Sequence, residues 1–238
     1  MLLAECTWKQ VAEYLERDDR IIVPVGSTEQ HGLRAVLGTD FLVPAGIARE
    51  VGKQSGVLVA PAVPFGMSLH HMAFPGTISL RPSTHLVLIY DILASLDRHG
   101  FRRILLLNGH GGNTPSLMAA VAEVNDVHTA LKVKVCDWWA LPGIQAVLEE
   151  AFGDKEGGHG TPGETSLVMA LHPGVVQEGP VHVQPSARPP FWRNALRWAE
   201  YHPDGSSGGA DANLASEMWG RRLLEVAVAG VLQELETW

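Results

Sequence analysis

The 238-residue chain is 46% hydrophobic and 18% charged, a composition typical of a globular protein with a sizeable core. Its formal net charge of -8 argues against a nucleic-acid-binding protein, which normally carries a basic face. No apolar run reaches the roughly 18 residues that a membrane span needs, and the first residues do not resemble a signal peptide. We therefore expect a single cytoplasmic domain over residues 1–238, with neither a nucleic acid nor a membrane as partner.

The predicted elements alternate between helices and strands. In chain order we expect a helix over 7–17, a strand over 21–25, a helix over 41–53, a strand over 56–63, a helix over 83–99, a strand over 104–107, a helix over 114–124, a strand over 133–136, a helix over 142–151, a helix that begins near 161, and a last helix over 213–236. Segment 180–203, rich in Pro and Trp, is left unassigned. This alternation predicts an α/β protein with three α/β/α layers and a mostly parallel central sheet.

Helix-capping signals mark several of these boundaries. Thr7 with Gln10, and Thr161 with Glu164, have the spacing of capping boxes. Asp40 stands at the expected N-cap of helix 41–53, and Asp is a preferred N-cap residue. Capping is therefore an alternative to any chemical role for Asp40 and for Glu164.

Polar loops follow two of the predicted strands. The loop GSTEQHG, after the first strand, carries Glu29 and His31, and Asp40 follows it; the loop NGHGGN, after the third strand, carries His110. Ligands of parallel sheets bind beyond the carboxyl ends of the strands, so we expect these side chains to meet there. Two imidazoles and two carboxylates suit Zn, Mn or Fe ions, and they favour a two-metal hydrolytic site in which one carboxylate bridges the ions.

A third loop, GHGTPGET, adds His159 and Glu164 to this set. For His159 the alternative is an exposed loop position. The loop NGHGGN is neither a P-loop, which needs Lys-Ser/Thr after its last glycine, nor a dinucleotide fingerprint, whose third glycine is Thr114 here. Its glycines are better explained as room for His110 to approach a ligand closely.

The order and spacing of several motifs resemble those of the creatininase (creatinine amidohydrolase) family. The motifs are EQHG with a following GTD, FPGTISL, NGHGGN, HGTPGETS and a late GADANLASEMWG. The resemblance implies a three-layer α/β fold with two divalent metal ions at the carboxyl edge of the sheet. It places Glu29 and His110 on one ion, His31 on the other and Asp40 between them, and it matches His159 to the family's catalytic histidine.

The chain departs from creatininase at three places. Gly111 and Gly112 stand where creatininase has a Tyr-Glu pair whose Glu binds the second ion, and we hypothesise that Glu164 takes over as ligand or as proton relay. Arg34 replaces a histidine of the family, and Lys155 replaces a lid tryptophan. Both cations favour an anionic substrate if they face the pocket, and the alternative for both is a surface position.

Three residues are predicted to bind the substrate: Arg34, His71 and Trp139. Trp139 lies near the expected place of a second lid tryptophan. His71 belongs to the adjacent pair His70 and His71, and we do not expect both of these side chains to face the same site.

These features predict a metal-dependent amidohydrolase that hydrolyses a non-peptide C–N bond of a small molecule, a cyclic amide or a formamide, with a metal-bound water as nucleophile. His159 and Glu164 are the predicted catalytic residues. The alternatives are a hydrolase of a cyclic sugar, cyclitol or lactone, a peptidase of peptide-cofactor maturation, and a non-catalytic binding protein. The resemblance also implies a homo-oligomer, a hexamer, with the C-terminal helix and the Trp-rich 190s as candidate interfaces.

Overall fold

A computed structural model describes residues 1–179 and 195–238, and its centre is a four-stranded sheet. The strands, in spatial order, are β2 (Leu58–Val59), β1 (Arg20–Val25), β3 (Arg103–Asn108) and β4 (Lys132–Asp137). All neighbouring strands are parallel, which confirms the predicted sheet. The apolar runs of the sequence form β1 and β3, because central strands of a parallel sheet are covered on both faces.

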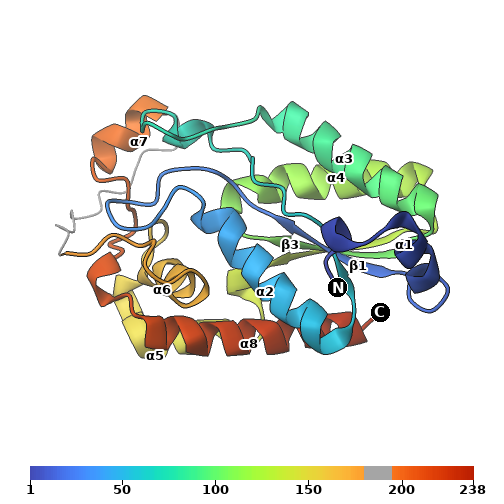
Figure 1. Ribbon diagram of the computed structural model, residues 1–238. Helices are drawn as coiled ribbons and strands as arrows, with labels where there is room; N and C mark the ends of the chain where they lie inside the picture. Colours follow the sequence, from blue (N-terminus) through green and yellow to red (C-terminus); the bar gives the residue numbers. More distant parts are fainter. Residues whose placement is uncertain (180–194) are drawn as a thin grey trace.

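Helices cover both faces of this sheet in three layers (Figure 1). One face carries α1 (Trp8–Leu15), α3 (Pro82–His99) and α4 (Thr114–Val127), and the other carries α2 (Thr39–Ser55), α5 (Ile144–Phe152), α6 (Pro162–Leu171) and α8 (Glu217–Glu236). Successive residues of β1 alternate between the two cores: Ile21 and Val23 belong to the first and Ile22 to the second. The predicted three-layer α/β fold is confirmed.

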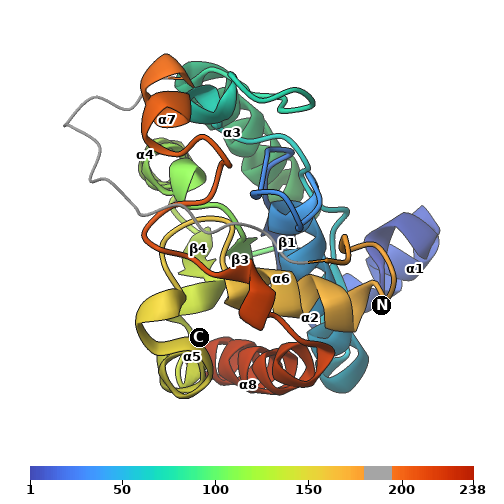
Figure 2. The same cartoon turned by 90° about the vertical axis from the view of Figure 1, so that its left-hand side faces the viewer.

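The carboxyl ends of the strands form the face that Figure 2 presents. The loops after β1 and β3 and the start of α6 meet at this face. α7 (Ala195–Tyr201) packs against the 3-10 turn Leu69–His71 beside it. The remaining 3-10 turns are Leu3–Glu5, Gly111–Asn113, Trp138–Ala140, Gly153–Lys155 and Ala212–Leu214.

The second strand is shorter than the sequence suggests. Only two of its residues pair with β1, because Pro61 and Pro64 have no N–H to donate to a ladder. Val63 rejoins the sheet through a single bridge to Val25. The last helix also begins later than expected, after Ser216, whose side chain accepts the N–H of Trp219.

Both predicted capping boxes are present, at Thr7 of α1 and at Thr161 of α6. The predicted N-cap role of Asp40 is wrong. α2 begins two residues earlier than expected, at Thr39, with Gly38 at its N-cap position. The carboxylate of Asp40 makes no capping bond and contacts histidine side chains instead.

The apolar face of α8 is buried inside the protein, where Leu223, Ala227 and Val231 pack against the sheet and the neighbouring helices. This face is therefore not available as the expected oligomer interface. Of the Trp-rich 190s, Trp192 lies outside the described residues, whereas Trp198 on α7 is buried.

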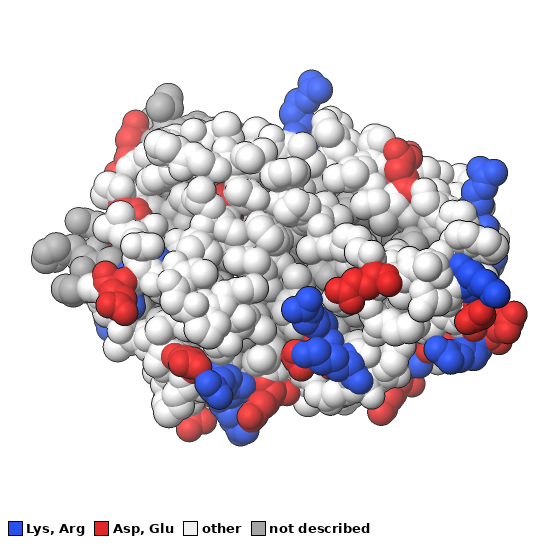
Figure 3. Space-filling model, in the orientation of Figure 1, with Lys and Arg blue, Asp and Glu red and all other residues white. Residues whose placement is uncertain are grey.

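Charged side chains of both signs are mixed on one face of the described residues. On the face shown in Figure 3, Lys and Arg side chains stand beside Asp and Glu side chains rather than forming a basic area. Within residues 1–179 and 195–238, no helix is long and apolar enough to cross a membrane.

Candidate metal centre

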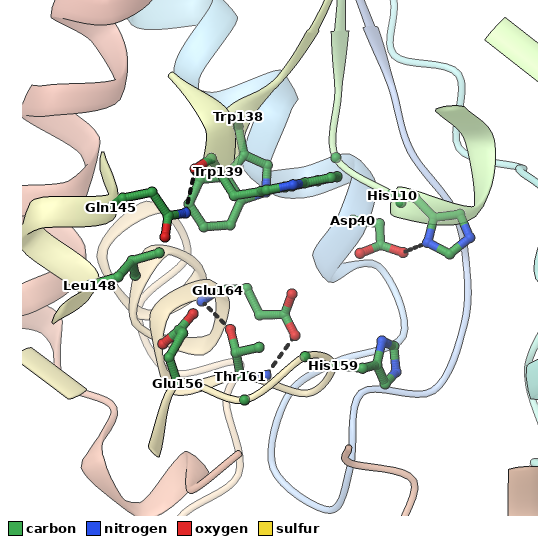
Figure 4. A pocket seen from close by; sticks show the side chains of 14 residues that line it. Asp40, His110, Trp138, Trp139, Gln145, Leu148, Glu156, His159, Thr161 and Glu164 are labelled. Carbon is green, nitrogen blue, oxygen red and sulfur yellow. Dashed lines mark hydrogen bonds and ion pairs between the residues drawn. The ribbon is translucent and has the colours of Figure 1, made fainter. Parts of the chain in front are cut away.

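A cavity of about 390 Å³ opens at the carboxyl end of the sheet. Figure 4 shows its side chains converging from the start of α2, the loop after β3, the turn after β4 and the start of α6. The described residues that line it are Asp40, Gly109, His110, Gly111, Trp138, Trp139, Gln145, Leu148, Glu156, Gly157, Gly158, His159, Thr161 and Glu164.

The three polar loops of the sequence meet at the inner end of this cavity. Their side chains form three overlapping groups whose ligand atoms lie within 4.8 Å of one another. The groups are Glu29, Asp40 and His110; His31, Asp40 and Glu164; and Glu29, His31 and His159.

Asp40 is shared by the first two groups. Its Oδ1 lies 2.9 Å from Nε2 of His31, and its Oδ2 lies 3.2 Å from Nδ1 of His110. Two glycines make this possible, because a Cβ at Gly26 or Gly109 would collide with the backbone of Asp40. The first turn of α2 can therefore lie directly against the ends of β1 and β3.

Main-chain carbonyls fix the tautomers of the two histidines beside Asp40. Nδ1 of His31 lies 3.1 Å from the carbonyl oxygen of Glu29, and Nε2 of His110 lies 3.0 Å from that of Met67. A carbonyl oxygen can only accept, so these nitrogens carry the protons of the neutral rings. The other nitrogen of each ring faces Asp40 with its lone pair, as in metal-binding histidines.

Three carboxylate oxygens of the cluster lack a hydrogen bond within the described residues. Among the described residues, neither oxygen of the fully buried Glu29 has a hydrogen-bond partner, and Oδ2 of Asp40 has none either. Burying a carboxylate is costly unless a charge or a hydrogen bond compensates it. These unpaired oxygens, together with the lone pairs of the two rings, are the donor set that a divalent cation requires.

The pKa values of the cluster residues also indicate a site for a positive charge. Burial would lower the pKa of His31, but the carboxylates of Asp40 and Glu164 outweigh it and raise the pKa to about 10. Burial is outweighed in the same way at His110, where Glu29 and Asp40 raise the pKa to about 9. Burial also raises the pKa of Glu29 to about 7, against the attraction of His110. The cluster thus binds protons on the nitrogens that face Asp40, where a metal ion would lie.

Comparison with known proteins identifies the family. The family profile described as creatininase, creatinine amidohydrolase, matches residues 4–235. The chain belongs to the creatininase family. It is 30% identical to creatinine amidohydrolase of Pseudomonas putida over 247 residues, which cover 97% of this chain and 94% of that protein.

Two further relatives show the range of the creatininase family. The manganese form of creatininase superposes with a TM-score of 0.87 at 30% identity, covering 99% of this chain and 97% of that chain. A 3-dehydro-scyllo-inosose hydrolase of Thermotoga maritima is 32% identical over 190 residues, 75% of this chain and 59% of that protein. The predicted recognition of the family, its fold and its class as a metal-dependent hydrolase are confirmed.

Glu164 forms the predicted capping box and also lies near His31. Its Oε1 accepts the N–H of Thr161 at 2.6 Å, which completes the capping box, and lies 3.9 Å from Nε2 of His31. At Gly112 a Cβ would collide with the ring of His110 and the carbonyl oxygen of Met67. The backbone of this creatininase-family protein therefore has no room for a ligand side chain at 112, and Glu164 supplies the carboxylate near His31.

Of the predicted substrate-binding residues, only Trp139 lines the cavity. Arg34 is turned away, because its guanidinium donates to the carbonyl oxygens of Gln177 and Ala212 at 3.0 and 2.9 Å. Lys155 is more than half exposed and lies near Asp154. Neither cation supports the anionic substrate suggested by the sequence.

His71 lies behind Glu29 rather than in the cavity. It is 1% exposed, and its Nε2 is 3.3 Å from Oε1 of Glu29. Neither His70 nor His71 is among the described residues that line the cavity. In the 3-10 turn, the ring of His70 lies 4.1 Å from that of His71 and stacks 6.1 Å from that of His110.

The sequence did not lead us to predict three residues of the site. Gln30 contacts both His71 and His159, and its place inside EQHG was a usable signal. Glu156 lines the cavity, but its position in the sequence, three residues before His159, matches no recognisable motif. Trp198 packs edge-on against His71 and His159, but it comes from a segment without a periodic pattern.

Proposed function

We propose that this protein is an amidohydrolase with a binuclear metal centre that cleaves a non-peptide C–N bond of a small cyclic amide or formamide. The observation that carries the proposal is the position of Asp40. Its two oxygens face His31 and His110, and each histidine belongs to a separate group of candidate ligands. A carboxylate shared by two such groups is the arrangement of a two-metal hydrolase.

The two ligand sets follow from these groups. Glu29, Asp40 and His110 would hold the first ion, and His31, Asp40 and Glu164 the second. Carboxylates and imidazoles suit Zn, Mn and Fe alike, so we expect two divalent ions without choosing among these metals. When bound, such ions supply Lewis-acid activation of water and of the scissile carbonyl group.

His159 is suited to move the proton of the reaction. It lines the cavity, and its Nε2 donates to the main-chain carbonyl oxygen of Gln30 at 2.7 Å. The unprotonated Nδ1 of the neutral ring then lies on the side of the metal centre, 3.7 Å from Oε1 of Glu29. In this position it can accept a proton from the nucleophile and return it to the leaving nitrogen. Glu164 is the second candidate for this transfer.

The cavity favours a neutral or N–H-rich substrate. The charged side chains among its described lining residues are Asp40, Glu156 and Glu164, together with the imidazoles of His110 and His159. Lys and Arg are absent from that lining. The indole of Trp139 and the amide of Gln145 supply an aromatic wall and a hydrogen-bonding group, which suit a small planar amide.

Replacing Glu156 with glutamine should raise KM for such a substrate roughly 10-fold above pH 7 and change kcat less. Burial raises the pKa of Glu156 to about 7, so above that pH its carboxylate can make a charge-assisted hydrogen bond, which contributes about 1.5 kcal/mol or more. Its Oε2 accepts the N–H of Gly163 at 3.1 Å, a bond that the amide oxygen of glutamine can keep. Steady-state kinetics with a neutral and a cationic amide test the prediction, with Glu149→Gln on the exposed side of α5 as control. Equal KM values for both variants would remove Glu156 from the substrate site.

Removing bound metal with a chelator should abolish hydrolysis of the active amide, and adding Zn, Mn or Fe(II) should restore it. The experiment uses a panel of lactams, formamides, cyclic ketones, lactones and short peptides, with elemental analysis of the purified protein. Activity that survives complete metal removal would contradict the proposal. Stoichiometric metal without hydrolysis of any C–N bond would contradict the substrate class alone.

A hydrolase of a cyclic sugar or cyclitol is the second candidate. The relative from Thermotoga maritima, a 3-dehydro-scyllo-inosose hydrolase, supports it. The panel separates the two candidates, since cyclic ketones and lactones carry no C–N bond. The cytoplasmic location and the homo-oligomer, a hexamer by family resemblance, remain predictions.

A further inference from the structure

The side chain of Gln30 lies at the centre of a hydrogen-bond network behind the candidate metal centre. Its Oε1 accepts the N–H of Gly32 at 2.9 Å, which fixes the orientation of the amide. Its Nε2 then faces three atoms: the carbonyl oxygen of Gly205 at 2.9 Å, Nδ1 of His71 at 2.8 Å and Nε2 of His159 at 3.0 Å. An amide nitrogen has two hydrogens, so one of these neighbours receives none.

The main chain decides which neighbour that is. Nε2 of His159 lies 2.7 Å from the carbonyl oxygen of Gln30, which only accepts, so this nitrogen carries a proton and donates it there. It cannot also accept from the amide of Gln30. The two amide hydrogens therefore go to the carbonyl oxygen of Gly205 and to Nδ1 of His71. Because Nδ1 of His71 accepts, the neutral ring of His71 has its proton on Nε2.

That proton faces Glu29. Nε2 of His71 lies 3.3 Å from Oε1 of Glu29, and among the described residues neither atom has a hydrogen-bond partner with good alignment. Both atoms are buried, so an N–H and a carboxylate oxygen are left facing each other. The second oxygen of Glu29, Oε2, lies 3.2 Å from the ring of His110, on the side of the first ligand group.

The surroundings hold this arrangement in place. The indole of Trp198 packs edge-on against the ring of His71, with the ring centroids 4.6 Å apart. Gly205, at φ +90°, approaches the amide of Gln30 so closely that a Cβ there would collide with it. A turned-over amide would bring its NH2 group against the N–H of Gly32, and a turned-over imidazole would lose the hydrogen bond from Gln30.

We propose that Gln30 is a positioning residue that fixes His71 as the Nε2–H tautomer, and that His71 orients the carboxylate of Glu29 by donating to Oε1. The inference rests on the proposed function, in which Glu29 is a ligand of the first metal ion. His71 thereby has a role behind the ligand, in place of the substrate contact expected from the sequence. Partners behind metal ligands commonly set ligand orientation in this way.

The tautomer can be read directly by long-range proton–nitrogen NMR of protein labelled with ¹⁵N-histidine, in the metal-free and the zinc-loaded forms. We expect His71, assigned through the spectrum of His71→Gln, to carry its proton on Nε2. In Gln30→Glu the introduced carboxylate accepts where the amide donated, so the proton should move to Nδ1. A proton on Nδ1 in the unchanged protein, or no change in Gln30→Glu, would overturn the proposal.

Metal affinity, measured by competition with a chromophoric chelator, tests the second step. His71→Leu removes the donor and should weaken the binding of one ion by roughly 10- to 100-fold, the usual effect of losing such a partner. His71→Gln keeps an N–H near the same position and should stay close to the unchanged protein. His85→Gln is the matched control, because His85 is a fully buried histidine whose Nδ1 pairs with Ser116. Its metal affinity should not change.

The outcomes separate the inference from the proposed function. Unchanged affinity in His71→Leu, with both ions bound, would refute the positioning role and leave the hydrolase proposal standing. If the unchanged protein binds no metal, the proposed function fails, and the NMR experiment on the metal-free protein still decides the tautomer. If His71→Leu does not fold, Gln30→Glu and His71→Gln carry the test.

Discussion

The variant Asp40→Asn is expected to lose at least one metal ion and to hydrolyse substrate about 10³-fold more slowly, the size of effect seen when a main source of electrostatic catalysis is removed. Its amide nitrogen cannot bind a cation, so the residue can no longer be shared by two ions. The amide can donate instead to Nε2 of His31 or Nδ1 of His110, because removing the charge of Asp40 removes a main reason for these nitrogens to bind a proton. The fold should therefore persist, and in the metal-free form its melting temperature should equal or exceed that of the metal-free unchanged protein.

Elemental analysis, thermal melting and kcat/KM on the same preparations test this expectation. Asp126→Asn is the matched control, because Asp126 is exposed on α4, so it should behave like the unchanged protein. Two ions per chain in Asp40→Asn would show that Asp40 is not shared between metals. A large loss of melting temperature between the metal-free forms of the two proteins would mean that its role is structural.

The variant Glu164→Gln should separate the two roles of that carboxylate. The amide oxygen of glutamine can still accept the N–H of Thr161, so the capping box survives. The negative charge beside His31 is lost, so the second ion should leave and the metal content should fall from two to one per chain. Activity should fall about 10²-fold or more, because the remaining ion lacks its partner.

Capping alone is measured by two further variants. Thr161→Ala removes the N-cap oxygen and should lower stability by about 1 kcal/mol while both ions stay bound. Glu164→Ala should combine both losses. If Glu164→Gln keeps two ions and full activity while Glu164→Ala loses only stability, then Glu164 is a helix cap and not a ligand.

The sequence predicted the strands and helices of the three layers well, because these elements depend on interactions between residues close together in the chain. The apolar runs that became β1 and β3, and the capping boxes at Thr7 and Thr161, act within a few residues. Strand β2 was overestimated because the apolar character of 56–63 outweighed Pro61 and Pro64, which cannot donate to a ladder. α7 was missed because its short segment has no clear periodic pattern.

Side-chain roles were harder to predict than elements. Asp40 has the sequence signature of an N-cap, but α2 begins at Thr39 and frees the carboxylate to face His31 and His110. Arg34 lies between His31 and Asp40, two of the candidate metal ligands. Two carbonyl oxygens from distant segments bind its guanidinium and turn it away from the cavity.

The sequence by itself determined the α/β architecture, the family and the residue types that gather at one edge of the sheet, because strand runs, glycine turns and ordered motifs are written along the chain. Only the tertiary structure decided how those residues are placed relative to one another. It placed Asp40 between two histidines, Glu164 beside the second of them and His71 behind Glu29. Such roles depend on distances of a few ångströms between loops far apart in the chain, and no local pattern encodes those distances.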